Sequence, residues 1–101
     1  MMHEKIESLA QLLGGNFHQD WPDEFDSDAT ALQAIIDSET TDQIRAGVEE
    51  IERLLADARS EIEFRNILIN EVGCYFDPES LGISYEQWLK KVRGVFAEEL
   101  G

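Results

Sequence analysis

The fifteen residues GGNFHQDWPDEFDSD, Gly14 to Asp28, bring together side chains that could do chemistry. They contain one histidine, His18, and five carboxylates: Asp20, Asp23, Glu24, Asp26 and Asp28. Such groups can bind a metal ion, act as acid and base in hydrolysis, or present negative charge to a protein partner. The spacing of these residues decides between the three kinds of site.

The pattern Asp26-x-Asp28-x-Thr30 resembles the start of a calcium-binding loop. That loop requires glycine at its sixth position and glutamate at its twelfth, where this chain has Ala31 and Asp37. Residues 29–36 also carry helical apolar spacing and cannot at the same time wrap an ion. The spacing therefore does not support a calcium site.

Zinc binding and cysteine catalysis are equally poorly supported. His3, His18 and Cys74 are scattered along the chain without ligand spacing. A Cys74–His18 pair is conceivable, but a cysteine at a helix end between Gly73 and Tyr75 is usually a small buried thiol. We expect no catalytic residue, no metal and no cofactor. An acid-dependent hydrolase remains as the enzymatic alternative.

The charge is the strongest compositional feature. The chain has 22 acidic and 8 basic residues, a net charge of −14. Residues 1–40 contain nine acids and a single base, Lys5. Phosphates would repel such a surface, so we expect no direct binding to nucleic acid. The same field favours a basic protein partner, although acidity can also serve solubility alone.

The length of 101 residues suits one domain, residues 1–101, with a single core. No run of 18 apolar residues is present, so we expect no membrane span. The start of the chain, MMHEKIESLAQLL, lacks the apolar segment of a secretory signal. A single cysteine agrees with a reducing compartment. Together these features predict a cytoplasmic protein.

Helical periodicity dominates, and no segment of useful length alternates with period two. The sequence therefore predicts an all-α domain of about five helices. Their apolar residues span 6–13, 31–36, 44–58, 62–72 and 85–96. Candidate N-caps precede the last four segments: Asp26 or Ser27, Thr40 or Thr41, Ser60 with Glu63, and Ser84 with Gln87.

For two of these helices the sequence also predicts which side chains are exposed and which are buried. In the third, Glu49 and Glu50 are predicted on the solvent face, where Glu49 can pair with Arg53 one turn later. In the fourth, apolar residues from Ile62 to Val72 spread around more than one face. We therefore expect the fourth helix to be the most buried.

Two aromatic connections, NFHQDWPDEF and CYFDPESLG, join the helices. We expect Phe17, Trp21, Tyr75 and Trp88 to hold the fold rather than to select a partner, because large aromatics dominate small cores. The acids beside Trp21 should then remain in water, since an unpaired buried carboxylate is costly.

These residues also carry a family resemblance. The segments LLGGNFHQDWPDEFDSDATALQAII, IERLLA and NEVGCYFDPESLGISYEQWLKKV resemble the immunity proteins of contact-dependent growth inhibition systems, the CdiI family. The resemblance extends from about Leu9 to Val95, and Asn16 departs from it where an aromatic residue is more usual.

The resemblance implies a cytoplasmic protein that binds and neutralises the C-terminal toxin domain of a neighbouring cell's inhibition system. Such toxins are often basic nucleases. The candidate toxin-binding residues are the densest exposed acids: Asp20, Asp23, Glu24, Asp26 and Asp28. The alternative is an acidic adaptor or regulator for another basic protein.

Overall fold

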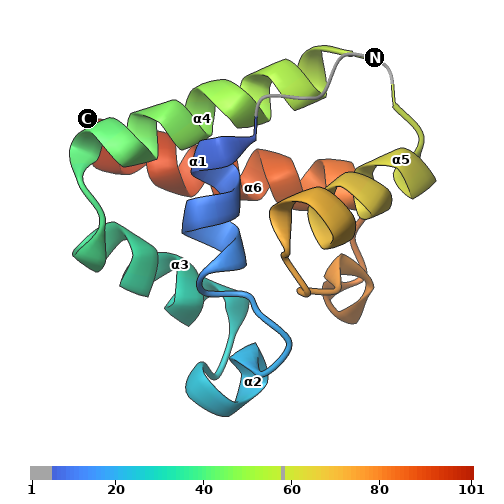
Figure 1. Cartoon of the computed structure of the whole chain (residues 1–101), viewed down its shortest axis with the longest axis horizontal. Helices are drawn as coiled ribbons and strands as arrows, with labels where there is room; N and C mark the ends of the chain where they lie inside the picture. Colours follow the sequence, from blue (N-terminus) through green and yellow to red (C-terminus); the bar gives the residue numbers. More distant parts are fainter. Residues whose placement is uncertain (1–5, 58) are drawn as a thin grey trace.

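The computed structural model describes residues 6–57 and 59–101, and these residues form helices without a β-strand. The five predicted helical segments are present, which confirms the all-α fold class (Figure 1). Each aromatic connection contains a further short helix. The elements are α1 (Glu7–Leu9) continued by the π-helical η1 (Ala10–Gly14), α2 (Trp21–Glu24), α3 (Asp28–Ser38), α4 (Thr41–Ala56), α5 (Glu61–Asn66) continued by the π-helical η2 (Ile67–Val72), the 3₁₀ helix η3 (Pro78–Leu81), and α6 (Tyr85–Leu100).

Side-chain caps begin the longer helices where the sequence predicted them. Ser27 and Thr40, rather than their alternatives, accept the hydrogen bonds that start α3 and α4. Complete capping boxes begin α5 at Ser60 and α6 at Ser84. Each cap satisfies backbone N–H groups that the first helical turn leaves without a partner. The helix starts are thus local consequences of the sequence.

The framework of the fold is the pair α4 and α6, which lie side by side and run in opposite directions (Figure 1). Ile51 and Leu54 from α4 and Leu89 and Val92 from α6 are almost completely buried. At the surface of the pair, Arg93 Nε donates to Glu52 Oε2 over 3.1 Å. An apolar face on each helix therefore builds the core, and the charged faces remain in water.

The α1–η1 segment packs against α4 through a buried carboxylate. Glu50 is only 3% exposed, and its oxygens accept hydrogen bonds from the backbone N–H groups of Ser8 at 3.2 Å and Leu9 at 2.9 Å. The prediction that Glu50 lies on the solvent face was therefore wrong. A carboxylate at a helix N-terminus satisfies free N–H groups and interacts favourably with the helix dipole, which offsets the cost of burial.

Where η1 and η2 meet, the backbones approach too closely for a side chain. A Cβ atom on Gly14 would overlap the carbonyl oxygen of Val72. The following residue, Gly73, has φ of 80°, the left-handed conformation in which glycine avoids the strain of other residues. These two glycines allow the first and fourth helical segments to pack against each other.

The α5–η2 segment differs from the prediction that it is the most buried helix. Phe64, Ile67 and Leu68 lie in the core, but the side chain of Ile62 is 72% exposed. The change from α to π geometry at Ile67 widens the helical turn, so a 3.6-residue period does not describe the whole segment. Ile62 lies in the α-helical part, two positions before the buried Phe64, so the two side chains point to opposite sides of the helix and Ile62 faces solvent.

Candidate functional site

The two aromatic connections meet at Phe17, which is fully buried. The backbone carbonyl oxygen of Phe17 accepts a hydrogen bond from the Tyr75 N–H over 2.7 Å. This bond ties the connection before α2 to the connection after η2. The acid-rich corner, which we define as residues 15–28, is therefore fastened to the body of the protein.

An aromatic cluster lies beneath this corner. The ring of Phe17 makes edge contacts with Trp21, Phe76 and Trp88 at centroid distances of 5.4, 5.7 and 5.4 Å. Phe76 also stacks on Trp88 at 4.7 Å. Such pairs contribute about 0.5–1.5 kcal/mol beyond the burial of their area. The expectation that Phe17, Trp21 and Trp88 pack inward is confirmed, with Trp21 partly buried.

Tyr75 departs from the same expectation, because its side chain is 43% exposed. The neighbouring Phe76, only 3% exposed, takes the inward position in the aromatic cluster. The side chains of Cys74, Tyr75 and Phe76 are buried, exposed and buried in turn, an alternation like that along a strand. Tyr75 is therefore available to a partner, whereas Phe76 holds the fold.

Asp28 is the candidate residue that the structure places inside the protein. It is 4% exposed, and its Oδ2 accepts hydrogen bonds from Trp88 Nε1 and Lys91 Nζ, both at 2.9 Å. Burial raises the pKa of Asp28, but the hydrogen bonds from Lys91 and Trp88 and the Lys91 charge outweigh it, so the pKa lies below its ordinary value. Its description as an exposed acid was wrong, and the residue joins α3 to α6.

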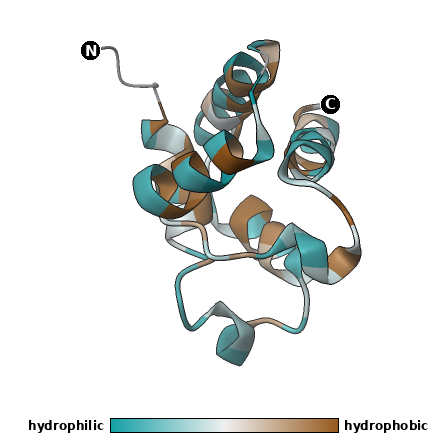
Figure 2. Ribbon diagram, turned by 90° about the vertical axis from the view of Figure 1, so that its right-hand side faces the viewer, coloured by the Kyte–Doolittle hydropathy of each residue, from teal (hydrophilic) through white to brown (hydrophobic). Residues whose placement is uncertain are grey.

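The other four candidates, Asp20, Asp23, Glu24 and Asp26, are exposed around α2. The short helix α2 is mainly hydrophilic and lies at the lower edge of the molecule (Figure 2). His18 connects two of these acids: its Nδ1 accepts from the Asp20 N–H at 3.1 Å, and its Nε2 lies 3.2 Å from Glu24 Oε1. The corner thus keeps its carboxylates in water on a fixed support.

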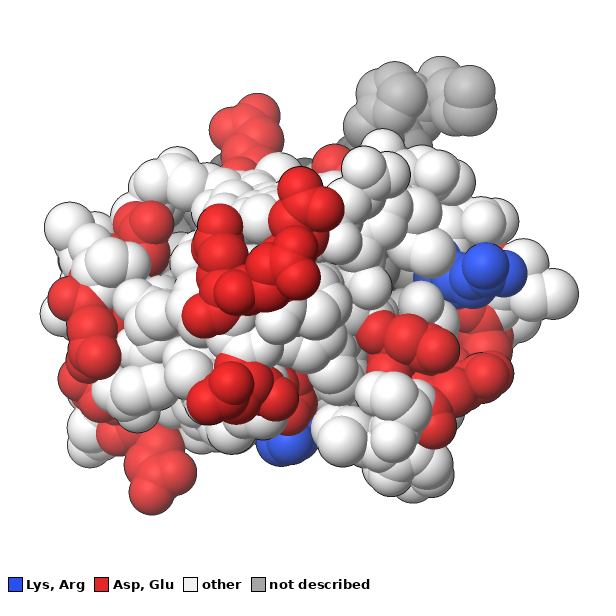
Figure 3. All heavy atoms as spheres, turned by 90° about the horizontal axis from the view of Figure 1, so that it is seen from below, with Lys and Arg blue, Asp and Glu red and all other residues white. Residues whose placement is uncertain are grey.

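Figure 3 views the molecule from the side on which α2 lies. Carboxylates are spread over this face and greatly outnumber the lysine and arginine side chains visible there. Because the opposing cations are few, the negative charges reinforce one another in the solvent in front of this face. The face can therefore attract a positively charged macromolecule.

The chemistry of Cys74 is suppressed by its position. Its side chain is fully buried, and burial raises the pKa of the thiol to about 12, so the reactive thiolate does not form at neutral pH. Within residues 6–57 and 59–101, no three histidine, cysteine, aspartate or glutamate side chains are grouped so as to hold a metal ion. The same part of the chain contains no helix long and apolar enough to cross a membrane.

Comparison with known proteins identifies the class to which this fold and corner belong. Residues 5–96 match the family described as CdiI immunity protein. One chain of the crystal structure of a CdiA-CT/CdiI complex from Y. kristensenii is similar over 97% of this chain and 100% of its own length, with 28% sequence identity and a TM-score of 0.82. No curated protein sequence matches. The chain belongs to the CdiI immunity protein family.

Proposed function

We propose that this chain is the immunity protein of a contact-dependent growth inhibition system. Residues 1–101 then act as one immunity domain in the cytoplasm, where they bind the cognate C-terminal toxin domain and neutralise it. The observation that carries the proposal is the family match over residues 5–96. The likeness to a chain of a CdiA-CT/CdiI complex along nearly its whole length supports the same conclusion.

The acid-rich corner is the proposed surface that first meets the toxin. Its exposed carboxylates are Asp20, Asp23, Glu24 and Asp26. With a net charge of −14, the chain is suited to a basic toxin, and we propose a nuclease because such enzymes hold phosphate backbones with lysine and arginine. Charge complementarity of this kind mainly accelerates association.

Asp28 has a different part in this proposal, because its carboxylate is already paired inside the protein. It holds the end of the corner against α6 and so fixes where the exposed acids point. A surface that is ordered before binding loses less conformational entropy in the complex. The proposed toxin-binding acids are therefore the four exposed residues, positioned by the fifth.

Inhibition in this proposal requires no catalysis by the immunity protein. It acts by stoichiometric occupancy of the toxin, without a metal or cofactor. The direct test is calorimetric titration of the purified toxin domain encoded beside this chain's gene. We expect a one-to-one complex with submicromolar affinity. The absence of binding between two folded proteins at tens of micromolar would contradict the proposed function.

A further inference from the structure

A second surface lies on the α5 side of the protein, where the sequence predicted a buried helix. Two neighbouring hollows of about 340 and 350 Å³ lie there. Ile62 lines the first and Tyr75 the second, while Arg65, Glu79 and Tyr85 line both. We call this continuous surface the Arg65 groove. It exposes 72% of the Ile62 side chain and 43% of the Tyr75 side chain.

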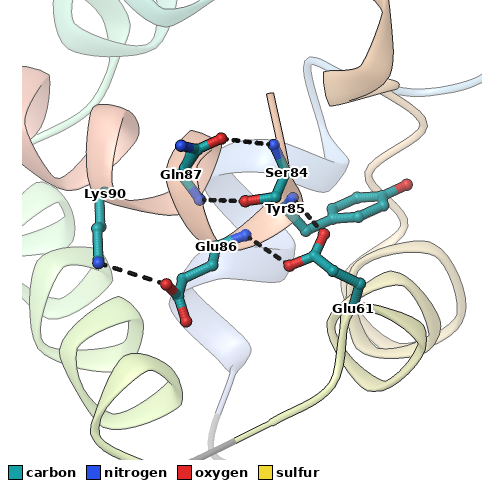
Figure 4. Close-up of polar contacts among 6 residues, drawn as sticks. All are labelled: Glu61, Ser84, Tyr85, Glu86, Gln87 and Lys90. Atoms are coloured by element: carbon teal, nitrogen blue, oxygen red, sulfur yellow. Dashed lines mark hydrogen bonds and ion pairs between the residues drawn. The ribbon is translucent and has the colours of Figure 1, made fainter. Parts of the chain in front are cut away.

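The walls of the Arg65 groove are fixed to each other by a carboxylate (Figure 4). Glu61, at the start of α5, accepts hydrogen bonds from the backbone N–H groups of Tyr85 at 2.6 Å and Glu86 at 3.3 Å, at the start of α6. Ser84 and Gln87 complete the cap of α6 through two reciprocal hydrogen bonds. The groove is therefore ordered without a ligand, which reduces the entropic cost of filling it.

Three acids beside this groove are engaged within the chain, whereas Glu79, which lines both hollows with Arg65, has no partner for its carboxylate among the described residues. The Glu61 carboxylate binds the α6 backbone, and Glu86 Oε2 lies 3.4 Å from Lys90 Nζ. Asp77 accepts from the Glu79 N–H at 3.0 Å and begins η3. These three acids have partners within the chain, so they offer little to a cation from outside.

Arg65 is the exception among the cations of the described residues, because it forms no ion pair there. Each of the others lies within 4.0 Å of a carboxylate: Arg45, Arg53, Arg59, Lys90, Lys91 and Arg93. In a chain of net charge −14, an unpaired guanidinium is unexpected on charge alone. Arginine binds carboxylates through two parallel hydrogen bonds and is enriched with tyrosine among residues that dominate interface energies.

We infer that the Arg65 groove is the surface that retains the toxin domain after the first encounter. It receives an apolar toxin side chain beside Ile62 and a toxin carboxylate at Arg65. This inference rests on the proposed function and adds the chemistry of the contact. A phosphate ligand is disfavoured, because the surrounding charge of the protein repels polyanions. The acid-rich corner then governs the association rate, and the Arg65 groove governs the dissociation rate.

The test measures association and dissociation of the adjacent-gene toxin domain by surface-based kinetics. The variants are Arg65→Glu and Ile62→Ser, and both replaced side chains are exposed, so their thermal melts should remain close to that of the wild type. Arg45→Glu and Leu81→Ser are the matched controls, since Arg45 lies on α4 and Leu81, 47% exposed, lines neither hollow. We expect dissociation at least about tenfold faster for the groove variants, and changes below about threefold for the controls.

A charge exchange identifies the partner of Arg65. Exposed acidic residues of the toxin domain are replaced one at a time by arginine, and one such variant should bind Arg65→Glu at least about tenfold more tightly than the unchanged toxin does. No rescue by any of these variants would overturn the carboxylate contact. Dissociation rates that are equal in wild type, groove variants and controls would overturn the inference while leaving the proposed function intact. A wild-type protein that does not bind the toxin would instead contradict the proposed function itself.

Self-association provides a further decisive observation. The proposed occupant is the toxin domain and not a second copy of this chain, so the isolated protein should be monomeric by light scattering at about 100 μM. A wild-type dimer that Ile62→Ser dissociates would assign the groove to self-association and overturn the inference.

Discussion

The indole Nε1 of Trp88 donates a hydrogen bond to the Asp28 carboxylate over 2.9 Å, across 60 positions of the sequence. Lys91, one helical turn after Trp88, donates to the same oxygen. Trp88 also supports Phe17 and Phe76 through its ring faces and edges. One residue of α6 therefore holds both ends of the acid-rich corner: Phe17 by packing and Asp28 by hydrogen bonding.

Removing the Asp28 carboxylate should destabilise the protein. Asp28→Ala leaves the buried indole N–H without an acceptor and should reduce the free energy of unfolding by about 2 kcal/mol. Asp28→Asn keeps an acceptor for the indole but loses the charge opposite Lys91, so its loss should be smaller, about 1 kcal/mol. Urea unfolding at neutral pH measures both. Equal stability of wild type and Asp28→Ala would show that the contact does not support the fold.

The contribution of Asp28 should depend on pH. Because its pKa in the folded protein lies below the ordinary value of 3.8, the ionised carboxylate stabilises the fold above that value, and the stabilisation is lost as pH falls through the lower, folded-state pKa. The difference in unfolding free energy between wild type and Asp28→Asn should therefore be constant from about pH 5 to 7 and shrink below about pH 4. Both proteins contain the same other carboxylates, so the titration of those groups cancels in the difference between the two unfolding free energies. A difference that grows as the pH falls would mean that folding raises the pKa of Asp28 instead of lowering it.

Gly14 and Gly94 should respond in opposite directions to alanine. At Gly14 the new methyl overlaps the Val72 carbonyl oxygen, so the helices must separate, at a cost of about 1–3 kcal/mol. Gly94 lies on the exposed side of α6 with no atom within 4 Å of its added Cβ, so alanine there should raise the free energy of unfolding by about 0.5–1 kcal/mol. Thermal and chemical unfolding of the two variants measure the difference. A Gly14→Ala protein as stable as Gly94→Ala would exclude the close approach of η1 and η2.

Several of these contacts could be predicted from the sequence, and others could not, for a physical reason. The caps at Ser60 and Ser84 involve residues three positions apart, and apolar spacing locates α4 and α6, so local patterns suffice. Buried carboxylates are different. Glu50 meets Ser8 and Leu9 more than forty positions away, and its own helix gives no sign that a free helix end will reach it.

The same distinction, between features set by neighbouring residues and features set by distant ones, applies to the candidate site. The dense acids of the corner are visible in the sequence, but the burial of Asp28 depends on Trp88 and Lys91, which only the packing of α3 against α6 brings near. The Arg65 groove was missed because the apolar residues of α5 and η2 suggested burial. The available signal was Ile62 itself, an apolar residue in the first turn of a helix between Glu61 and Glu63.

Neutralising the acid-rich corner should slow binding to the toxin domain. The variant carries four changes: Asp20→Asn, Asp23→Asn, Glu24→Gln and Asp26→Asn. At low salt its association rate should fall about tenfold, while dissociation changes little, because exposed charges act mainly on encounter. Association of the wild type should itself slow steeply with added salt, as screening shortens the range of the field to about 8–10 Å.

A matched variant removes the same number of charges from α4 and the end of α6. Its changes are Asp42→Asn, Glu49→Gln, Glu98→Gln and Glu99→Gln. These residues are exposed and lie away from α2, so association should slow less than in the corner variant. Equal slowing by both variants would mean that net charge, and not the corner, directs the encounter. Association indifferent to salt and to both variants would mean that the acidity serves solubility.

Growth of cells that make the cognate toxin domain shows whether this chain neutralises it. The toxin domain is expressed from an inducible promoter in the cytoplasm, with either this chain or an unrelated protein of similar size. Cell density is followed after induction, and the amount of folded chain is measured in the same cells. We predict continued growth with this chain and arrest with the unrelated protein. Arrest in cells that contain folded chain in excess over toxin would mean that the chain does not neutralise this toxin domain.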